Sequence, residues 1–154
     1  MDLEILKEKI TSYLDGIGAE YRAETSSDND GEFLKVKTYI SFNLNKIEFV
    51  YYFTFEIGDG GLLRIDVHFD EDSKFVLPRN EKNDKLMFEF NEKSSIFTAS
   101  ISSNNGINKD IFYLHFDGII EGESEVLDAI KAGMDELCDE DLMQLEWLIY
   151  KRCE

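Results

Sequence analysis

Alternating apolar and polar residues over 33–70 constrain the fold of this 154-residue chain more than any other feature. Apolar residues occupy every second position in three successive segments, which turn-forming residues at 45–46 and 58–61 separate. A period of two places each apolar set on one face of a pleated sheet. The sequence therefore predicts an antiparallel three-stranded meander with one strongly apolar face, which helices must cover.

The segments on either side of the meander are predicted from changes in this period. Apolar residues at helical spacing over 3–17 predict an amphipathic helix that ends at two glycines. A short strand around 20–24 and a polar loop over 25–31 are expected next. Over 80–95 the spacing predicts a helix capped by Asn83 or Asp84, with a strand through Leu86, Phe88 and Phe90 as the alternative.

The C-terminal third predicts a second hairpin followed by a helix. Strands are expected over 96–103 and 111–118, with turn residues at 104–106 between them. Ser124 is a plausible helix cap, Asp139 a plausible restart, and the apolar stripe continues through Leu148 and Ile149. The chain is therefore expected to form a single α+β domain over 1–154. Its predicted architecture is an antiparallel meander flanked by helices, in the order α-βββ-α-ββ-α.

The net charge of −17, from 33 acidic and 16 basic residues, limits the partners of such a domain. A surface of this sign repels nucleic acid and anionic membranes, so neither is expected to bind directly. It favours a partner protein with a basic or apolar docking surface. No apolar run approaches the ~20 residues of a membrane span. With no signal-peptide pattern and two cysteines typical of reduced thiols, the sequence predicts a cytoplasmic protein.

Acidic residues are concentrated over 117–146, where Lys131 is the single basic residue. Repulsion between neighbouring carboxylates on a helix costs about 0.2–0.5 kcal/mol per close pair. The alternatives are a solvated face, a docking surface for basic residues, and an imitation of DNA phosphates. The candidate docking residues are Glu121, Glu125, Asp128, Asp135, Glu136, Asp139, Glu140 and Asp141.

A second candidate surface lies on the predicted meander, on the side opposite its apolar face. Tyr39, Val50 and Tyr52 share that side. If it is exposed, these residues form an apolar-aromatic patch able to hold a partner. If a helix covers it, they belong to the core. Both alternatives are open from the sequence.

The two histidines of the chain lie in identical tripeptides, His68-Phe69-Asp70 and His115-Phe116-Asp117. Were the two strands neighbours, both histidines could converge with Asp66 and their aspartates as a metal site. The simpler interpretation places both histidines on the solvent face, so no metal, cofactor or catalytic residue is assigned. Purification without chelator that yields no stoichiometric metal would exclude the metal site.

The order of elements, with the segments FNEKSSIFTASIS and DIFYLHFDGII, resembles the type III secretion chaperone-like fold. The related bacterial family named for sensory-transduction regulators is similar, and Asn91 stands where asparagine often marks the junction of helix and strand. The resemblance implies a non-enzymatic protein, often a homodimer, that binds other polypeptides. It carries no catalytic residues over to this chain.

Three functions follow as hypotheses, in this order. The first is a non-catalytic acidic protein-binding module, chaperone-like or a regulatory adaptor. The second is a nucleic-acid-mimicking inhibitor of a DNA- or RNA-binding enzyme, such as a mobile-element protein acting against a host defence nuclease. It predicts salt-sensitive binding and loss of inhibition on charge reversal at Glu136, Asp139 and Asp141. The third is a metal-dependent enzyme using Asp66, His68, Asp70, His115 and Asp117.

Overall fold

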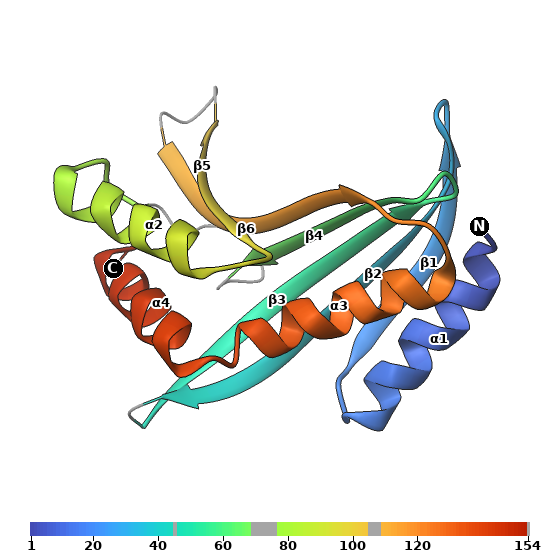
Figure 1. Ribbon diagram of the computed structural model, residues 1–154, viewed down its shortest axis with the longest axis horizontal. Coiled ribbons are helices and arrows are strands. Elements are labelled where there is room, and N and C mark those ends of the chain that lie inside the picture. Colours follow the sequence, from blue (N-terminus) through green and yellow to red (C-terminus); the bar gives the residue numbers. More distant parts are fainter. Residues whose placement is uncertain (45, 69–76, 105–108, 154) are drawn as a thin grey trace.

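The computed structural model describes residues 1–44, 46–68, 77–104 and 109–153, and within them four helices pack on a six-stranded antiparallel sheet (Figure 1). None of the described helices combines the length and apolar character needed to cross a membrane. The helices are α1 (Leu3–Gly16), α2 (Glu81–Lys93), α3 (Glu123–Glu136) and α4 (Glu140–Cys153). The strands are β1 (Tyr21–Asp28), β2 (Gly31–Leu44), β3 (Ile47–Gly58), β4 (Leu62–His68), β5 (Thr98–Asn104) and β6 (Lys109–Ile119).

The strands lie in the order β1-β2-β3-β4-β6-β5. The predicted meander is confirmed as β2, β3 and β4, and the predicted second hairpin as β5 and β6. The predicted turn at 104–106 lies largely outside the described residues. β4 pairs with β6 although α2 and β5 separate them in the chain, so Asp66 stands opposite His115. This non-local pairing joins the two halves of the protein into one sheet.

One face of the sheet carries the hydrophobic core, and the helices cover that face. Its largest side chains, among them Phe53, Phe55 and Phe90, are almost completely buried. Leu3, Leu6 and Ile10 of α1 are buried as predicted, and so are the stripes of α3 and α4. Two residues depart from the predicted stripes. Leu148 is 46% exposed, and Ile17, which follows the end of α1, is 48% exposed, so their predicted places in the stripes are wrong.

The first strand, β1, is longer than predicted. Residues 25–28, expected to be part of a polar loop, continue the strand and pair with residues 31–34 of β2. Almost every side chain of β1 is exposed, so the segment lacks the apolar alternation that marks the other strands. The backbone hydrogen bonds to β2 hold this edge strand in place, although it has no apolar face of its own.

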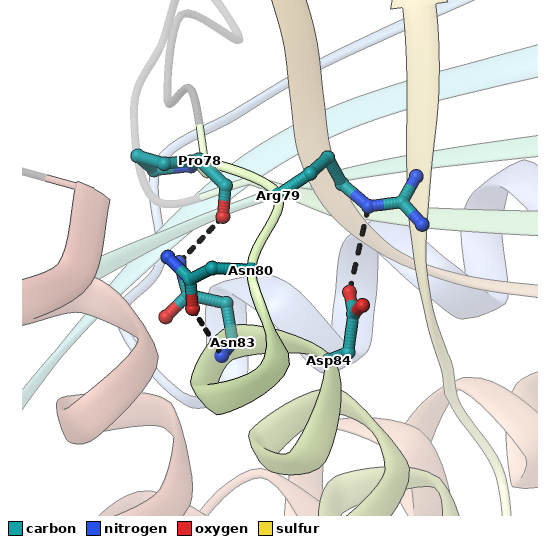
Figure 2. Close-up of polar contacts among 5 residues, drawn as sticks. All are labelled: Pro78, Arg79, Asn80, Asn83 and Asp84. Atoms are coloured by element: carbon teal, nitrogen blue, oxygen red, sulfur yellow. Dashed lines mark hydrogen bonds and ion pairs between the residues drawn. The ribbon is translucent and has the colours of Figure 1, made fainter.

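The helix predicted over 80–95 is confirmed, and the alternative strand through Leu86, Phe88 and Phe90 is wrong. Neither predicted cap is correct, because the side chain of Asn80 accepts a hydrogen bond from the backbone N–H of Asn83 at 3.0 Å (Figure 2). The amide of buried Asn83 instead donates to the carbonyl of Pro78. Residues before and inside the first turn thus fix the start of α2.

The two C-terminal helices begin at different kinds of residue. Gly122 with φ of 86° precedes α3 and offers no side-chain cap, so the predicted cap at Ser124 is wrong. The Ser124 hydroxyl accepts a hydrogen bond from Lys9 Nζ at 3.0 Å instead. The predicted restart at Asp139 is confirmed, since its carboxylate accepts from the backbone N–H of Leu142 at 3.1 Å at the start of α4.

Candidate functional site

The face of the sheet turned away from the helices, here called the open face, carries the side chains that alternate with the core residues. No described helix packs over it, as the ribbon shows (Figure 1). Its central side chains are polar, charged or aromatic. They are Lys35, Lys37, Tyr39, Tyr52, Thr54, Glu56, Arg64, Asp66, His68, Tyr113, His115 and Asp117.

Four rings form a row across the open face. Tyr39 of β2 stands opposite Tyr52 of β3, with ring centroids 5.9 Å apart, and Tyr52 stands opposite His68 of β4. The row continues to β6, where the centroid of Tyr113 lies 6.5 Å from that of His68. Tyr39 is 41% exposed, and the other three rings are half-buried against one another. We call these four residues the aromatic row.

The predicted patch of Tyr39, Val50 and Tyr52 therefore lies on this open face. Val50 and Tyr52 are half-buried, although no described helix covers them. They line a hollow of about 810 Å³, bordered by His68 and by basic side chains of the first two strands, Arg22 and Lys37. The hollow gives the aromatic row a concave surface in place of a flat one.

A charged row runs parallel to the aromatic row. Glu24, Lys35, Glu56, Arg64 and Asp117 are successive cross-strand neighbours on β1, β2, β3, β4 and β6, so the sign alternates at every strand. Opposite charges directly across a strand pair stabilise the register. The open face is consequently balanced in charge, although the chain as a whole is strongly acidic.

Polar contacts connect the two histidine strands with the edge strand β5. Ser100 Oγ lies 2.9 Å from His115 Nε2, and His115 Nδ1 lies 3.5 Å from Asp117 Oδ2. Arg64 Nε contacts the second oxygen of Asp117 at 3.1 Å. The order of groups is that of a nucleophile, a base and an orienting carboxylate. Acyl transfer also needs hydrogen-bond donors aimed at an oxyanion. The backbone amides of β6 that pair with β4 and β5 are already used in the sheet, so they do not serve as such donors.

The residues proposed as metal ligands are brought to one surface by the pairing of β4 with β6. Even so, no group of three or more His, Cys, Asp or Glu side chains in the described ranges is arranged to hold a metal ion. Asp70, the remaining proposed ligand, lies outside those ranges. Asp117 is bound to Arg64, and Ser100 occupies one nitrogen of His115. Asp117 and His115 are thus engaged with other side chains of the protein.

Burial shifts the pKa of His68 in the aromatic row and of Asp66 beside it. It raises the pKa of Asp66, an effect that the neighbouring His68 partly offsets. Burial lowers the pKa of His68, against the attraction of Asp66. His68 is therefore mainly neutral at pH 7. Its Nδ1 is buried and has no hydrogen-bond partner among the described residues.

The acidic residues proposed for docking lie elsewhere, in and around α3 and α4. Most are exposed to solvent. Exposed positions are held by Glu121, Glu125, Asp128, Asp135, Asp139, Glu140 and Asp141. Asp139 additionally caps α4, and Glu136 is half-buried, so charge reversal at either position would disturb the fold as well as a docking surface.

Glu136 ties the end of α3 to the segment between α2 and β5. Its carboxylate accepts hydrogen bonds from Ser94 Oγ at 2.8 Å and from the backbone N–H of Ile96 at 3.2 Å. Ser95 contributes its backbone N–H at 2.6 Å and its hydroxyl at 2.8 Å. Four bonds to one carboxylate give Glu136 a structural role.

Replacing Glu136 by alanine is expected to lower the free energy of unfolding by about 2 kcal/mol, because it leaves these donors without their charged acceptor. Asp135→Ala is the matched control, since the neighbouring Asp135 is exposed. Urea unfolding of both variants measures the difference. Equal stability of the two variants would show that the Glu136 bonds contribute nothing.

Sequence reasoning missed two members of this surface and one buried carboxylic acid. Tyr113 and Ser100 alternate with core residues on β6 and β5, and that period was the available signal. Glu146 is completely buried in α4, where its Oε2 accepts a hydrogen bond from the Tyr51 hydroxyl at 2.9 Å. It lies four residues after Leu142 and three before Ile149, so helical spacing placed it on the buried stripe.

Comparison of the chain with protein-family models, with curated proteins and with solved structures finds no match in any of the three.

Proposed function

We propose that this protein is a binding module that holds a partner polypeptide on the open face of its sheet. The observation that carries the proposal is the aromatic row, four rings side by side on a face that no described helix covers. Tyrosine is enriched at protein interfaces, since each ring supplies a large contact area at low conformational cost. The hollow beside the row gives a partner side chain a place to enter.

The balanced charge of the open face favours a partner polypeptide of mixed charge over a partner that carries charges of one sign. Its alternating charged row offers both signs to side chains and to backbone groups. The resemblance of the element order to secretion chaperones and sensory-transduction regulators agrees with this proposal. In this proposal the contacts among Ser100, His115 and Asp117 stiffen the surface.

A second candidate, a nucleic-acid-mimicking inhibitor, is favoured by the exposed acids of α3. Glu125, Asp128 and Asp135 are exposed, and none of them forms an ion pair with another described residue. Such a surface would recognise a strongly basic protein through long-range attraction that salt weakens. Charge reversal at these three positions avoids the structural roles of Glu136 and Asp139.

Capture of partners from a lysate of the native cell, at low and at high salt, separates the two candidates. A polypeptide retained at high salt is expected from the open face, and the double variant Tyr39→Ser/Tyr52→Ser should weaken its affinity at least about tenfold when the pair is reconstituted from purified proteins. Leu148→Ser removes an exposed apolar side chain of α4 and is the matched control. Retention of only a basic nucleic-acid enzyme, lost at high salt, would favour mimicry.

A further inference from the structure

The edge of the sheet formed by β1 is a second surface that the aromatic row does not involve. β1 pairs with β2 over eight consecutive residues with no bulge, and no strand in the described part of the chain pairs with its other side. It contains no proline, and its side chains are exposed except for half-buried Ala23. Natural edge strands usually carry a bulge, a proline or another obstacle to pairing.

The direction of the backbone groups of β1 follows from the sheet register. The carbonyl of Glu32 accepts from the backbone N–H of Asp59 at 3.1 Å, so Glu32 directs its backbone groups to β3. Backbone direction alternates along a strand, so residues 31, 33, 35 and 37 bond to β1, where their partners are residues 28, 26, 24 and 22. The backbone groups that face outward therefore belong to Tyr21, Ala23, Thr25 and Ser27.

A cleft of about 750 Å³ continues this edge. One wall consists of Thr25, Ser26 and Ser27, and the other of residues 1–4, at the start of α1. Glu32 lies at the junction. Thr25 and Ser27, two of the four outward residues, thus line one cavity together with Glu4 and Glu32. A strand added beside β1 would enter it.

We propose that the β1 edge and this cleft receive an extended, lysine- or arginine-bearing segment of a partner polypeptide, added as a seventh strand. Main-chain hydrogen bonds to the four outward residues would provide affinity, and a basic side chain in the cleft would meet Glu4 and Glu32. Electrostatic attraction favours a basic segment at this edge, whereas a second copy of this acidic chain would be repelled. Each copy carries −17, and the acids at 20, 24 and 28 outnumber Arg22 along the edge.

Amide hydrogen exchange with synthetic octapeptides tests the proposal. The probe alternates lysine with valine, and the comparison peptide has glutamate in place of lysine. In the free protein the amides of Tyr21, Ala23, Thr25 and Ser27 should exchange faster than those of residues 22, 24 and 26, which are bonded to β2. A saturating amount of the lysine peptide should slow the four outward amides at least about tenfold, and the glutamate peptide should not.

Two variants keep the test decisive. Ala23→Pro removes one outward N–H without removing a bond to β2, so it should fold and lose the lysine peptide. If it does not fold, the double variant Glu4→Gln/Glu32→Gln should weaken the same peptide about tenfold with the backbone unchanged. Tyr39→Ser should bind the peptide normally, which separates this site from the open face. Equal slowing by both peptides, slowing by neither, or slowing that depends only on protein concentration would overturn the proposal.

Discussion

Relative to the parent protein, Glu146→Gln is expected to gain several kcal/mol of stability between about pH 5 and about pH 9. The reason is the position of Glu146, whose side chain is completely buried in α4. Its Oε2 accepts from Tyr51, and its Oε1 has no hydrogen-bond partner among the described residues. Burial raises the pKa of Glu146 to about 8, with a further contribution from Glu136 and an opposing one from the Tyr51 hydrogen bond.

The sign follows from proton binding. In the unfolded chain the carboxyl has its ordinary pKa of 4.5, so between 4.5 and about 8 the folded state holds a proton that the unfolded state has released. The contribution of Glu146 to the free energy of unfolding is therefore fully present below pH 4.5, and it is lost as the pH rises to about 8 and just beyond. The difference between the two pKa values corresponds to roughly 5 kcal/mol, a large fraction of the stability of a domain.

Urea unfolding of both proteins at several pH values measures this effect. Glutamine keeps an acceptor for Tyr51 but cannot ionise, and the pKa of Tyr51 is itself raised by burial, so the phenol stays protonated throughout. Subtracting the two curves removes the other carboxylates, which both proteins share. A difference that is constant with pH would contradict a buried, protonated Glu146.

Gly61→Ala is expected to lower the free energy of unfolding by about 3 kcal/mol, from the combined cost of backbone strain and overpacking. Gly61 has a φ of +94°, and an added Cβ would lie well inside van der Waals distance of the Ile120 carbonyl oxygen. The carbonyl of Gly61 also accepts from the backbone N–H of Ile120 at 2.8 Å. This turn therefore fixes the end of β6 against the β3–β4 connection.

Gly60→Ala is the matched control for that substitution. An added Cβ at Gly60 would meet nothing within 4 Å, and its φ lies outside the left-handed region. Thermal unfolding of the two variants should separate them clearly, with Gly60→Ala close to the parent. A similar loss in both variants would show that the contact with Ile120 does not decide the conformation of this turn.

Regular periodicity explains which parts of the fold could be predicted. In β3 the alternating residues Tyr51, Phe53, Phe55 and Ile57 are buried, as that period requires, and the stripes of α1 and α3 follow the helical spacing. The full length of β1 cannot be predicted from this pattern, because Thr25, Ser26 and Ser27 carry no apolar signal. Helix caps were misplaced by a few residues, since several residues that could cap lie close together at 80–84 and 122–124.

The candidate site depended on information that a local pattern does not contain. The period of two placed Tyr39, Tyr52 and both histidines on the side opposite the core, and the structure confirms that side. It could not show that β4 pairs with β6, because residues 69–108 separate the two strands in the chain. That pairing alone brings Tyr113 to His68 and completes the aromatic row.

The most direct test of the open face as a docking surface is photo-cross-linking from single positions. A benzophenone amino acid replaces Tyr39 in one variant and Leu148, which is exposed on α4, in another. With the partner retained at high salt, position 39 is expected to form the cross-link and position 148 to form none. A cross-link from position 148, or from Glu125 on acidic α3, with none from position 39, would contradict the account.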